Sequence, residues 1–539
     1  MPIAHLVRFA LVICASWIVT VDAKSAPLPP AGASRADATQ ASAVLQGDRS
    51  LGEINPAVYG QFAEHLGRGI YEGIWVGANS PIPNTHGFRN DVIEALRHIK
   101  VPVIRWPGGC FAEDYNWRDG IGPRAQRPVR VNSSWGDIDE PNTFGTHEYM
   151  EFSELIGSKT YVTAPVGAGT PLALEQWLEY MTSDSHSTLA EERRKNGRAQ
   201  PFHVDYLGIG NEAWGCGGQM TATEYAAEFR RFVTFARVPP TQKMQTVAVG
   251  PSDDNYQWTE VMMRETYNQP TSKLYGGLEA LSLHYYTLPN STWEHKGAAV
   301  GFPESEWIGA LSHALRLDEY ITKHSAIMDR YDPAKKVALV VDEWGTWYDP
   351  EKDSNPSHLY QQNSLRDAVT AAVTFNIFHH HADRVRMANI AQMVNVLQAM
   401  ILTDKEKMLL TPTYHVFDML QGFQGATSLP LQVDSPRYSA AGMSIPAISG
   451  SAARGTDGTV HISLVNLDPH HDTNLRMALK GMAPTMVKAT LLTANTMDAH
   501  NTFAAPNLVH PVPYTDVKLE AGSLQVNIPA MAVLTLELK

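Results

Sequence analysis

Two glutamates stand directly after apolar, strand-like runs, and their side chains are the strongest candidates for chemistry. Glu212 ends the segment YLGIGNE, and Glu343 ends the segment VALVVDE. A carboxylate at the end of a buried strand is costly unless it is paired or has a task. Two carboxylates that flank one bond can hydrolyse a glycosidic linkage, one as proton donor and the other as nucleophile or base. A pair of capping or ion-paired glutamates is the structural alternative.

Other polar residues follow further apolar runs of the same kind. Asn211 directly precedes Glu212 and could donate a hydrogen bond to a sugar hydroxyl beside the reacting carbon. Structural salt bridges could explain any one of these positions, but they do not easily explain the whole set. The remaining positions at the ends of runs are Glu64-His65, Gly108-Gly109-Cys110, Gly167-Ala168-Gly169, Asp253-Asp254, His284-Tyr285-Tyr286 and Gln392.

The elements that must position these residues are eight apolar runs that alternate with helical patterns over residues 58–410. Such runs are typical of a parallel sheet buried on both faces, and eight of them close a barrel. We therefore predict an α/β fold with a (β/α)8 TIM barrel, whose catalytic groups gather at the C-terminal ends of the strands. An open doubly wound sheet is the alternative. The runs are Tyr59–Glu64, Val101–Trp106, Tyr161–Val166, Tyr206–Gly210, Thr246–Gly250, Ala280–His284, Val337–Asp342 and Val385–Ile390.

The pattern of apolar and turn-forming residues changes after the barrel. Residues 411–539 carry short strand patterns such as TVHISLVN and AVLTLEL, separated by clusters of Gly, Pro, Asn and Asp. Short strands with this punctuation indicate an all-β sandwich. We expect residues 45–57 to supply an N-terminal strand that joins this C-terminal sandwich domain.

The N-terminus has the pattern of a targeting segment. A basic residue, the apolar run FALVICASWIVTV and the small residues of Val21-Asp22-Ala23 follow one another, as in a signal peptide that is cleaved after Ala23. Residues 1–23 are therefore predicted to be a signal peptide and residues 24–44, rich in Ala, Pro and Ser, a flexible leader. The expected location of the mature protein is periplasmic or secreted.

Composition excludes several classes of function. With 44% hydrophobic residues the chain is not disordered as a whole. Its 56 acidic and 43 basic residues give a formal charge of −13, so it lacks a global basic field that would hold a phosphate backbone. We expect neither nucleic acid nor, in the mature form, a membrane as a partner.

Six sequence blocks, in order and at the expected strand ends, carry a resemblance to a known family. They are GQFAEHLGRGIYEGIW, RWPGGCFAEDYNWRDGIGP, YLGIGNEAWGCGG, LSLHYYT, VVDEWGTWYD and IAQMVNVLQAM. The sequence resembles the α-L-arabinofuranosidases of glycoside hydrolase family 51 over roughly residues 50–539. The resemblance implies a barrel joined to a sandwich, and a retaining mechanism with Glu212 as general acid/base and Glu343 as nucleophile.

The same resemblance implies a set of sugar contacts. Cys110 stands where some family members carry Asn, and Trp117 is expected either at the mouth of the pocket or in the core. We expect no metal and no cofactor. The residues that match ring-binding positions of the family are Glu64, Asn211, His284, Tyr286 and Gln392.

These expectations predict an exo-acting hydrolase that releases terminal non-reducing α-L-arabinofuranosyl residues from arabinan, arabinoxylan and arabino-oligosaccharides. Two alternatives stay open: an endoglucanase or xylosidase on the same scaffold, and a non-catalytic carbohydrate-binding protein. The resemblance also allows a homo-oligomer.

The cysteines and clustered histidines leave structural questions open. Cys110 and Cys216 both belong to loops on the predicted catalytic rim, where they could form a disulfide or stay as two buried thiols. Adjacent side chains on a helix point in different directions, so His379, His380 and His381 are expected to be loop or surface residues rather than zinc ligands.

Overall fold

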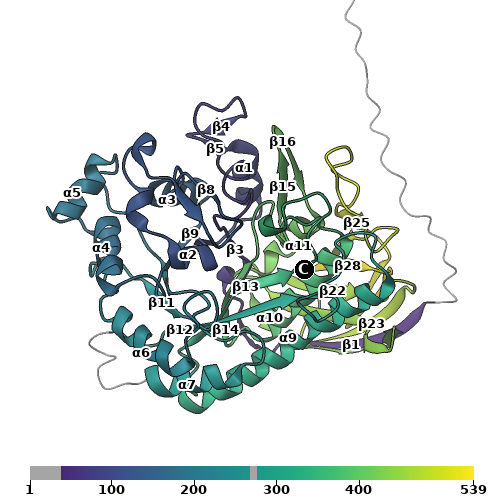
Figure 1. Ribbon diagram of the computed structural model, residues 1–539. Coiled ribbons are helices and arrows are strands. Elements are labelled where there is room, and N and C mark those ends of the chain that lie inside the picture. Colours follow the sequence, from purple (N-terminus) through teal and green to yellow (C-terminus); the bar gives the residue numbers. More distant parts are fainter. Residues whose placement is uncertain (1–37, 268–275) are drawn as a thin grey trace, which may run out of the picture.

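The computed structural model describes residues 38–267 and 276–539 (Figure 1). The predicted signal peptide and residues 24–37 of the predicted leader lie outside the described residues. Within the described ranges no helix is long and apolar enough to cross a bilayer.

Eight parallel strands close into a barrel in chain order, so the predicted fold class is confirmed. Each strand is buried along most of its length, which explains why the runs read as continuously apolar. Two neighbouring barrel strands are longer than predicted, because β12 and β13 stay paired up to Thr287 and Thr346. Glu343 therefore lies inside a strand. The barrel strands are β3 (Gly60–Phe62), β6 (Val103–Trp106), β9 (Lys159–Ala164), β10 (Tyr206–Ile209), β11 (Gln245–Ala248), β12 (Ala280–Thr287), β13 (Ala338–Thr346) and β14 (Val385–Ile390).

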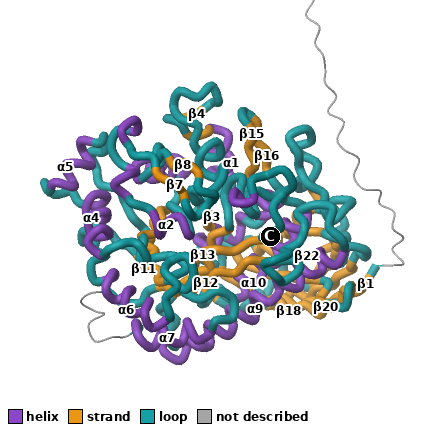
Figure 2. Tube along the Cα trace, in the orientation of Figure 1, coloured by secondary structure: helices purple, strands orange, loops and turns teal. Residues whose placement is uncertain are grey.

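Helices surround the barrel, and Figure 2 shows them outside the central strands. The spacing of apolar residues in the segment Asn90–Lys100 predicts one of them, and α1 there buries Val92, Ile93 and Leu96. The described helices are α1 (Asn90–His98), α2 (Cys110–Asp114), α3 (Thr146–Ile156), α4 (Pro171–Thr182), α5 (Thr188–Lys195), α6 (Ala222–Val233), α7 (Tyr256–Thr266), α9 (Glu304–Tyr331), α10 (Leu365–His380) and α11 (Pro412–Met419). The 3-10 turns are η1 (Pro56–Tyr59), η2 (Trp117–Gly120), η3 (Arg124–Gln126), η4 (Pro356–His358) and η5 (Gln421–Phe423).

Two sheets form the second domain, and their strands alternate buried and more exposed residues, as in β23 and β27. The five-stranded sheet runs β18 (Leu431–Asp434), β1 (Thr39–Gln46), β23 (Thr473–Lys480), β27 (Ser523–Ile528) and β26 (Val517–Glu520). The seven-stranded sheet runs β2 (Gly52–Glu53), β17 (Thr427–Leu429), β21 (Ile448–Arg454), β22 (Val460–Asn466), β28 (Ala532–Leu538), β24 (Val487–Leu492) and β25 (Val512–Tyr514).

The N-terminal strand begins earlier than the sequence pattern suggested. Residues 39–44, which we assigned to a flexible leader, belong to β1, where they pair in parallel with β23 (Figure 1, the purple and yellow-green arrows). Ala43 and Leu45 are buried in the core of this second domain. The Ala and Ser residues of this segment are typical of a linker. They form a strand here because their backbone pairs with β23.

Short hairpins decorate the loops of both domains. Two of them follow the first and the second barrel strand in the sequence. The hairpins are β4 (Asn84–Thr85) with β5 (Phe88–Arg89), β7 (Arg130–Asn132) with β8 (Ile138–Glu140), β15 (Ile401–Asp404) with β16 (Lys407–Leu410), and β19 (Arg437–Ala440) with β20 (Met443–Pro446).

The barrel and the second domain share a packed boundary. The Trp307 indole N–H on α9 donates to the Leu467 carbonyl oxygen at 2.9 Å. His379, at the end of α10, is fully buried between the Tyr59 hydroxyl and the Ser451 hydroxyl, each at 2.8 Å. Our prediction of a loop or surface histidine is therefore wrong for His379, because the second domain covers this end of the helix.

Candidate active site

Glu343 lies at the centre of the barrel mouth and is buried, with only 5% of its surface exposed. Arg105, at the end of β6, donates to its Oε1 at 2.7 Å, and the Tyr286 hydroxyl donates to its Oε2 at 2.8 Å. Both donors stabilise the carboxylate in its charged form. They also fix its orientation, because each holds one oxygen.

Glu212 directly follows β10 and approaches Glu343 from the opposite part of the rim. Its side chain is 19% exposed, so it is more open to solvent than Glu343. Its backbone has φ 40°, in the left-handed region that a residue with a side chain rarely adopts. The carbonyl of Glu212 accepts from the N–H groups of Gly215 and Gly217, which closes a tight turn around it.

His284 joins the two glutamates. Its Nδ1 lies 2.9 Å from Oε1 of Glu212 and 3.6 Å from Oε2 of Glu343, while its Nε2 lies 3.3 Å from Asp342. Burial lowers the pKa of His284, but the surrounding carboxylates, Glu343 first, outweigh burial and raise that pKa to about 10. The imidazolium can then donate from both nitrogens.

A buried network beneath the two glutamates was missed by the sequence analysis. Arg105 also donates to Oδ1 of Asn211 at 2.6 Å and lies 3.6 Å from Asp342, which accepts from the Tyr161 hydroxyl at 2.7 Å. Burial opposes the charge on Asp342, yet Arg105 and His284 hold its pKa below the usual value. The signal in the sequence is a single arginine inside the apolar run VPVIRW, because a buried cation requires anionic partners.

Glu64 forms one wall of the pocket and is buried. Its Oε1 accepts from the backbone N–H groups of Gly109 and Phe111 and from the indole of Trp135, at 2.9, 3.1 and 2.9 Å. Its Oε2 accepts from the Gln392 amide at 3.0 Å. Burial, followed by the charge of Glu343, raises the pKa of Glu64 to about 7.

Two glycines let the chain pass close to these carboxylates. A Cβ on Gly109 would lie 2.8 Å from Oε1 of Glu343, and one on Gly108 would lie 2.6 Å from Cγ of Glu64. The segment PGGC therefore favours glycine at both positions, because a Cβ would displace the carboxylate side chain beside it.

Aromatic rings continue outward from the catalytic pair. The ring of Tyr286 packs edge-on against Trp347 with centroids 4.9 Å apart, and Trp347 packs against Trp293 at 5.3 Å. Trp293 is 52% exposed. An amphipathic wall of this kind suits the apolar faces of sugar rings.

Of two further residues predicted in the site, Trp117 lies away from the pocket, whereas Cys110 lies on its rim as one half of a disulfide. Trp117 is buried in η2 and packs against Tyr180 at 5.4 Å, so it belongs to the core rather than to the mouth of the pocket. Trp135, from the β7–β8 hairpin, contacts Glu64 instead. Cys110 starts α2 and forms a disulfide with Cys216, with Cα atoms 5.6 Å apart, so it has no thiol to offer a sugar.

The structure brings the other predicted residues together. Within one cluster, an oxygen of Glu212, a ring nitrogen of His284 and an oxygen of Glu343 lie within 4.8 Å of one another. Asn211, Tyr286, Glu64 and Gln392 connect to this cluster through the contacts given above. Such a cluster can transfer a proton at one carboxylate while the other acts on a carbon between them.

Known proteins resemble this chain along most of its length. A family model described as the α-L-arabinofuranosidase 1 domain matches residues 95–295, and one described as the α-L-arabinofuranosidase C-terminal domain matches residues 342–532. An intracellular exo-α-L-arabinofuranosidase of Bacteroides ovatus is 44% identical over 501 residues, which are 93% of this chain and 96% of that protein.

Solved structures agree with these sequence matches. The arabinofuranosidase of family 51 from Xanthomonas axonopodis pv. citri is 52% identical, has a TM-score of 0.90 and covers 93% of this chain and 100% of its own. The α-L-arabinofuranosidase of Thermotoga maritima, solved with arabinose, is 29% identical with a TM-score of 0.80, over 92% of this chain and 99% of its own.

The comparison with Bacteroides ovatus also corrects the predicted location. We expected a secreted or periplasmic protein, but that relative is named an intracellular enzyme, which contradicts the prediction of export. The prediction depended on an apolar run followed by small residues, and that pattern alone is not specific to cleaved signal peptides.

Proposed function

The chain belongs to the α-L-arabinofuranosidases of glycoside hydrolase family 51, and from this premise we propose a retaining, exo-acting mechanism. The enzyme is a glycoside hydrolase, and its proposed substrates are arabinan, arabinoxylan and arabino-oligosaccharides. From these it releases terminal non-reducing α-L-arabinofuranosyl residues.

The short distance between the two carboxylates carries this proposal. An oxygen of Glu212 and an oxygen of Glu343 lie within 4.8 Å of each other. Retaining enzymes hold their carboxyl groups about 5–5.5 Å apart, whereas inverting enzymes leave about 6.5–9.5 Å to admit a water molecule. The separation therefore favours direct attack by one carboxylate.

The surroundings of the two groups support different roles. Glu343 is the deeper group and accepts from Arg105 and Tyr286, so it suits the nucleophile that attacks the anomeric carbon. Glu212 is the more exposed group and suits the acid that protonates the leaving oxygen. In the second step Glu212 takes a proton from a water molecule while the water oxygen bonds to the anomeric carbon. The bond between that carbon and Glu343 breaks, which frees the sugar and the Glu343 carboxylate.

The buried polar wall supports recognition of one terminal sugar. Glu64, Gln392 and Asn211 present acceptors and donors around Glu343, and Trp135 lies against Glu64. Hydrogen bonds to sugar hydroxyls near the reacting carbon strengthen in the transition state, so this wall would contribute to the rate as well as to binding.

The configuration of the first product tests the mechanism. We expect proton NMR to show α-L-arabinofuranose as the first sugar formed from an aryl α-L-arabinofuranoside, followed by slow mutarotation. Release of the β-anomer first would contradict retention. A parallel screen of arabinan, arabinoxylan and a linear β-glucan should show arabinose release from the first two only, and cleavage of the glucan backbone would favour the endoglucanase alternative.

The homo-oligomer that the resemblance allows stays a prediction. Light scattering coupled to size exclusion would measure the mass of the particle in solution, and a mass equal to one chain would contradict it.

A further inference from the structure

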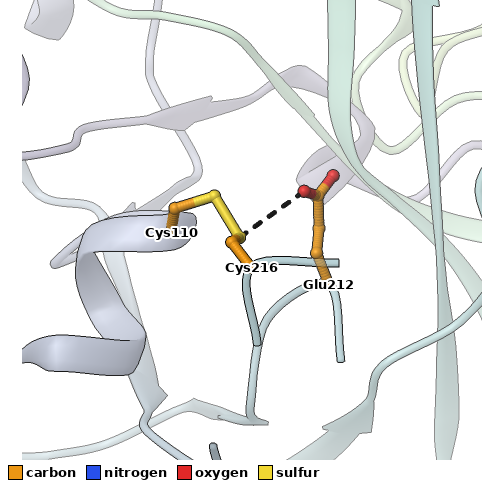
Figure 3. A group of neighbouring side chains, drawn as sticks. All are labelled: Cys110, Glu212 and Cys216. Atoms are coloured by element: carbon orange, nitrogen blue, oxygen red, sulfur yellow. Dashed lines mark hydrogen bonds between the residues drawn. A yellow bond between two sulfur atoms is a disulfide. The ribbon is translucent and has the colours of Figure 1, made fainter. Parts of the chain in front are cut away.

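A disulfide lies on the catalytic rim, directly beside Glu212 (Figure 3). Cys110 follows β6 and Cys216 follows β10, so the bond joins two of the loops that form the pocket. Cys216 is exposed and Cys110 is half-buried, and both can therefore be reached by small solutes. The disulfide lies outside the barrel strands, which pair with one another through backbone hydrogen bonds.

The sulfur of Cys216 is also close to the carboxylate of Glu212. Its Sγ lies 3.7 Å from Oε2 of Glu212; a dashed line joins the two side chains in Figure 3. The two sulfurs and one oxygen of Glu212 all lie within 4.8 Å of one another. The structure thus assembles two soft ligands and one carboxylate around a single point.

These distances can be compared with those of a tetrahedral zinc site. Zinc binds thiolate sulfur at about 2.3 Å and carboxylate oxygen at about 2.0–2.2 Å, which places sulfur and oxygen roughly 3.6 Å apart and two sulfurs roughly 3.8 Å apart. The sulfur of Cys216 and the oxygen of Glu212 already have this spacing. The two sulfurs must separate once the bond between them is broken, and the Cys110 sulfur, which lies within 4.8 Å of the Glu212 oxygen, must then take its place at the metal by side-chain rotation.

We propose that reduction of the Cys110–Cys216 disulfide creates a binding site for a thiophilic divalent cation such as Zn²⁺, with Glu212 as the third ligand. The reductant is a thiol or a phosphine. Two electrons and two protons convert the disulfide to two thiols, and a phosphine reductant becomes its oxide with oxygen taken from water. Zinc then displaces the two thiol protons, and water completes the fourth position.

Binding at this site removes Glu212 from proton transfer. A carboxylate that donates its oxygen to zinc cannot carry the proton for the leaving group, so the reduced, zinc-bound enzyme is inactive. This effect on activity rests on the proposed role of Glu212, whereas the metal site itself does not.

A second group of ligands near Glu212 provides the competing interpretation. Glu212, His284 and Glu343 also lie within 4.8 Å of one another and contain no sulfur. His284 is already engaged by Glu212 and Asp342, and Glu343 by Arg105. Zinc at this second group would not depend on the redox state, which separates the two interpretations experimentally.

The test uses the full chain with Cys14→Ser, so that only Cys110 and Cys216 can supply thiolates. The protein is reduced with a water-soluble phosphine, desalted under argon and titrated with Co²⁺, and its free thiols are counted. We expect two thiols, a thiolate-to-cobalt charge-transfer band and visible bands of tetrahedral cobalt. An oxidised sample should show none of these bands. A disulfide that resists reduction in the folded protein, or reduced protein without the bands, would overturn the proposal.

Activity provides the second readout, with each sample compared with its own zinc-free rate. We expect Zn²⁺ to inhibit the reduced enzyme at concentrations at least about tenfold lower than the oxidised enzyme, and a chelator to restore the rate. Cys216→Ser should lose this sensitivity by a similar factor. Equal inhibition of reduced and oxidised enzyme would place zinc on Glu212, His284 and Glu343 and overturn the proposal. Cobalt bands without inhibition would support the metal site and contradict the role of Glu212.

Discussion

Charge is the main constraint on the pocket at the scale of single residues. Three carboxylates, from Glu212, Asp342 and Glu343, surround one guanidinium and one imidazole in a largely buried space. Removing either cation would leave buried carboxylates without compensation, which is strongly unfavourable. Arg105 and His284 therefore position the acidic groups as much as they neutralise them.

Glu343→Ala tests the nucleophile. We expect turnover to fall by on the order of 10⁴-fold or more, because no group remains to form the covalent intermediate. Azide should occupy the space left by the carboxylate and restore part of the rate, giving a glycosyl azide of inverted configuration. A rescued product of retained configuration would contradict the assignment.

Glu212→Ala tests the acid/base. On an aryl glycoside with a good leaving group, the first step needs little acid assistance and should survive better than the second. Rapid mixing should therefore show a burst of released phenol followed by slow turnover, and azide should accelerate the slow phase. Equal losses on substrates with good and poor leaving groups would argue against this role.

His284→Gln tests the electrostatics of the cluster through pH. The pKa of His284 is raised from 6.5 to about 10 in the folded protein. Its contribution to stability is therefore fully present below pH 6.5 and is lost as pH rises toward about 10, by at most about 1.4 kcal/mol per pH unit. We expect denaturant midpoints of the wild type to fall across this window more steeply than those of the variant.

An exposed histidine supplies the control for that measurement. His186→Gln, whose side chain is 95% exposed, should keep the pH dependence of the wild type. If His284→Gln also kept the pH dependence of the wild type, this would contradict a stabilising role for the charged His284 ring in the folded protein.

At the scale of elements, the short helix α2 holds two strand ends in place. Glu113 accepts from the N–H of Asn211 at 2.6 Å with one oxygen, and from those of Val166 and Gly167 at 2.8 and 2.7 Å with the other. One buried side chain thus ties the ends of β9 and β10 to α2, the helix that begins at Cys110. The peptide that precedes Glu212 depends on this contact.

Glu113→Gln should disturb both stability and catalysis. The amide nitrogen cannot accept, so at least one peptide N–H loses its partner, at a cost of about 1–3 kcal/mol. We expect kcat/KM to fall by roughly tenfold, mainly through kcat, because a small displacement of Glu212 weakens proton transfer. Denaturation and steady-state kinetics measure the two effects. Asp114→Asn, on the same helix but exposed, is the control and should change neither stability nor kcat/KM. A Glu113→Gln enzyme with normal kcat would contradict the positioning role of Glu113.

At the scale of the whole molecule, the chain crosses between its two domains more than once. Strands β1 and β2 belong to the sheets of the second domain and precede the barrel, and the other strands of those two sheets follow it. The boundary contains buried polar contacts at His379 and Trp307. We therefore expect the two domains to unfold together.

His379→Ala tests this coupling. It removes a buried ring and leaves the hydroxyls of Tyr59 and Ser451 without that partner, so we expect a loss of about 2–4 kcal/mol. Urea unfolding should stay a single transition, followed by tryptophan fluorescence and by circular dichroism. The control His381→Ala, whose partner Asp318 is 57% exposed, should cost about 1 kcal/mol or less. Two separated transitions in the wild type would contradict coupled unfolding.

The sequence by itself determined the barrel, its eight strands and two glutamates near their C-terminal ends, although Glu343 lies within β13 rather than at its end. A strand that is buried on both faces is apolar along its whole length. This pattern lies within a few consecutive residues, so the sequence alone is enough to identify the strand. The carboxyl ends of parallel strands lie on one rim of a barrel. The fold class alone therefore predicts that Glu64, Glu212, His284 and Glu343 lie near one another.

Only the tertiary structure decided which side chains touch. Arg105 and Glu343 are 238 residues apart and Glu64 and Trp135 are 71 apart, and Cys110 and Cys216 are separated by 106 residues. The small residues of β1 become a strand only because β23 offers an edge, and Trp117 enters the core while Trp135 faces the pocket. Such contacts depend on barrel closure and on the paths of loops, because no local pattern of residues encodes the distance between two loops.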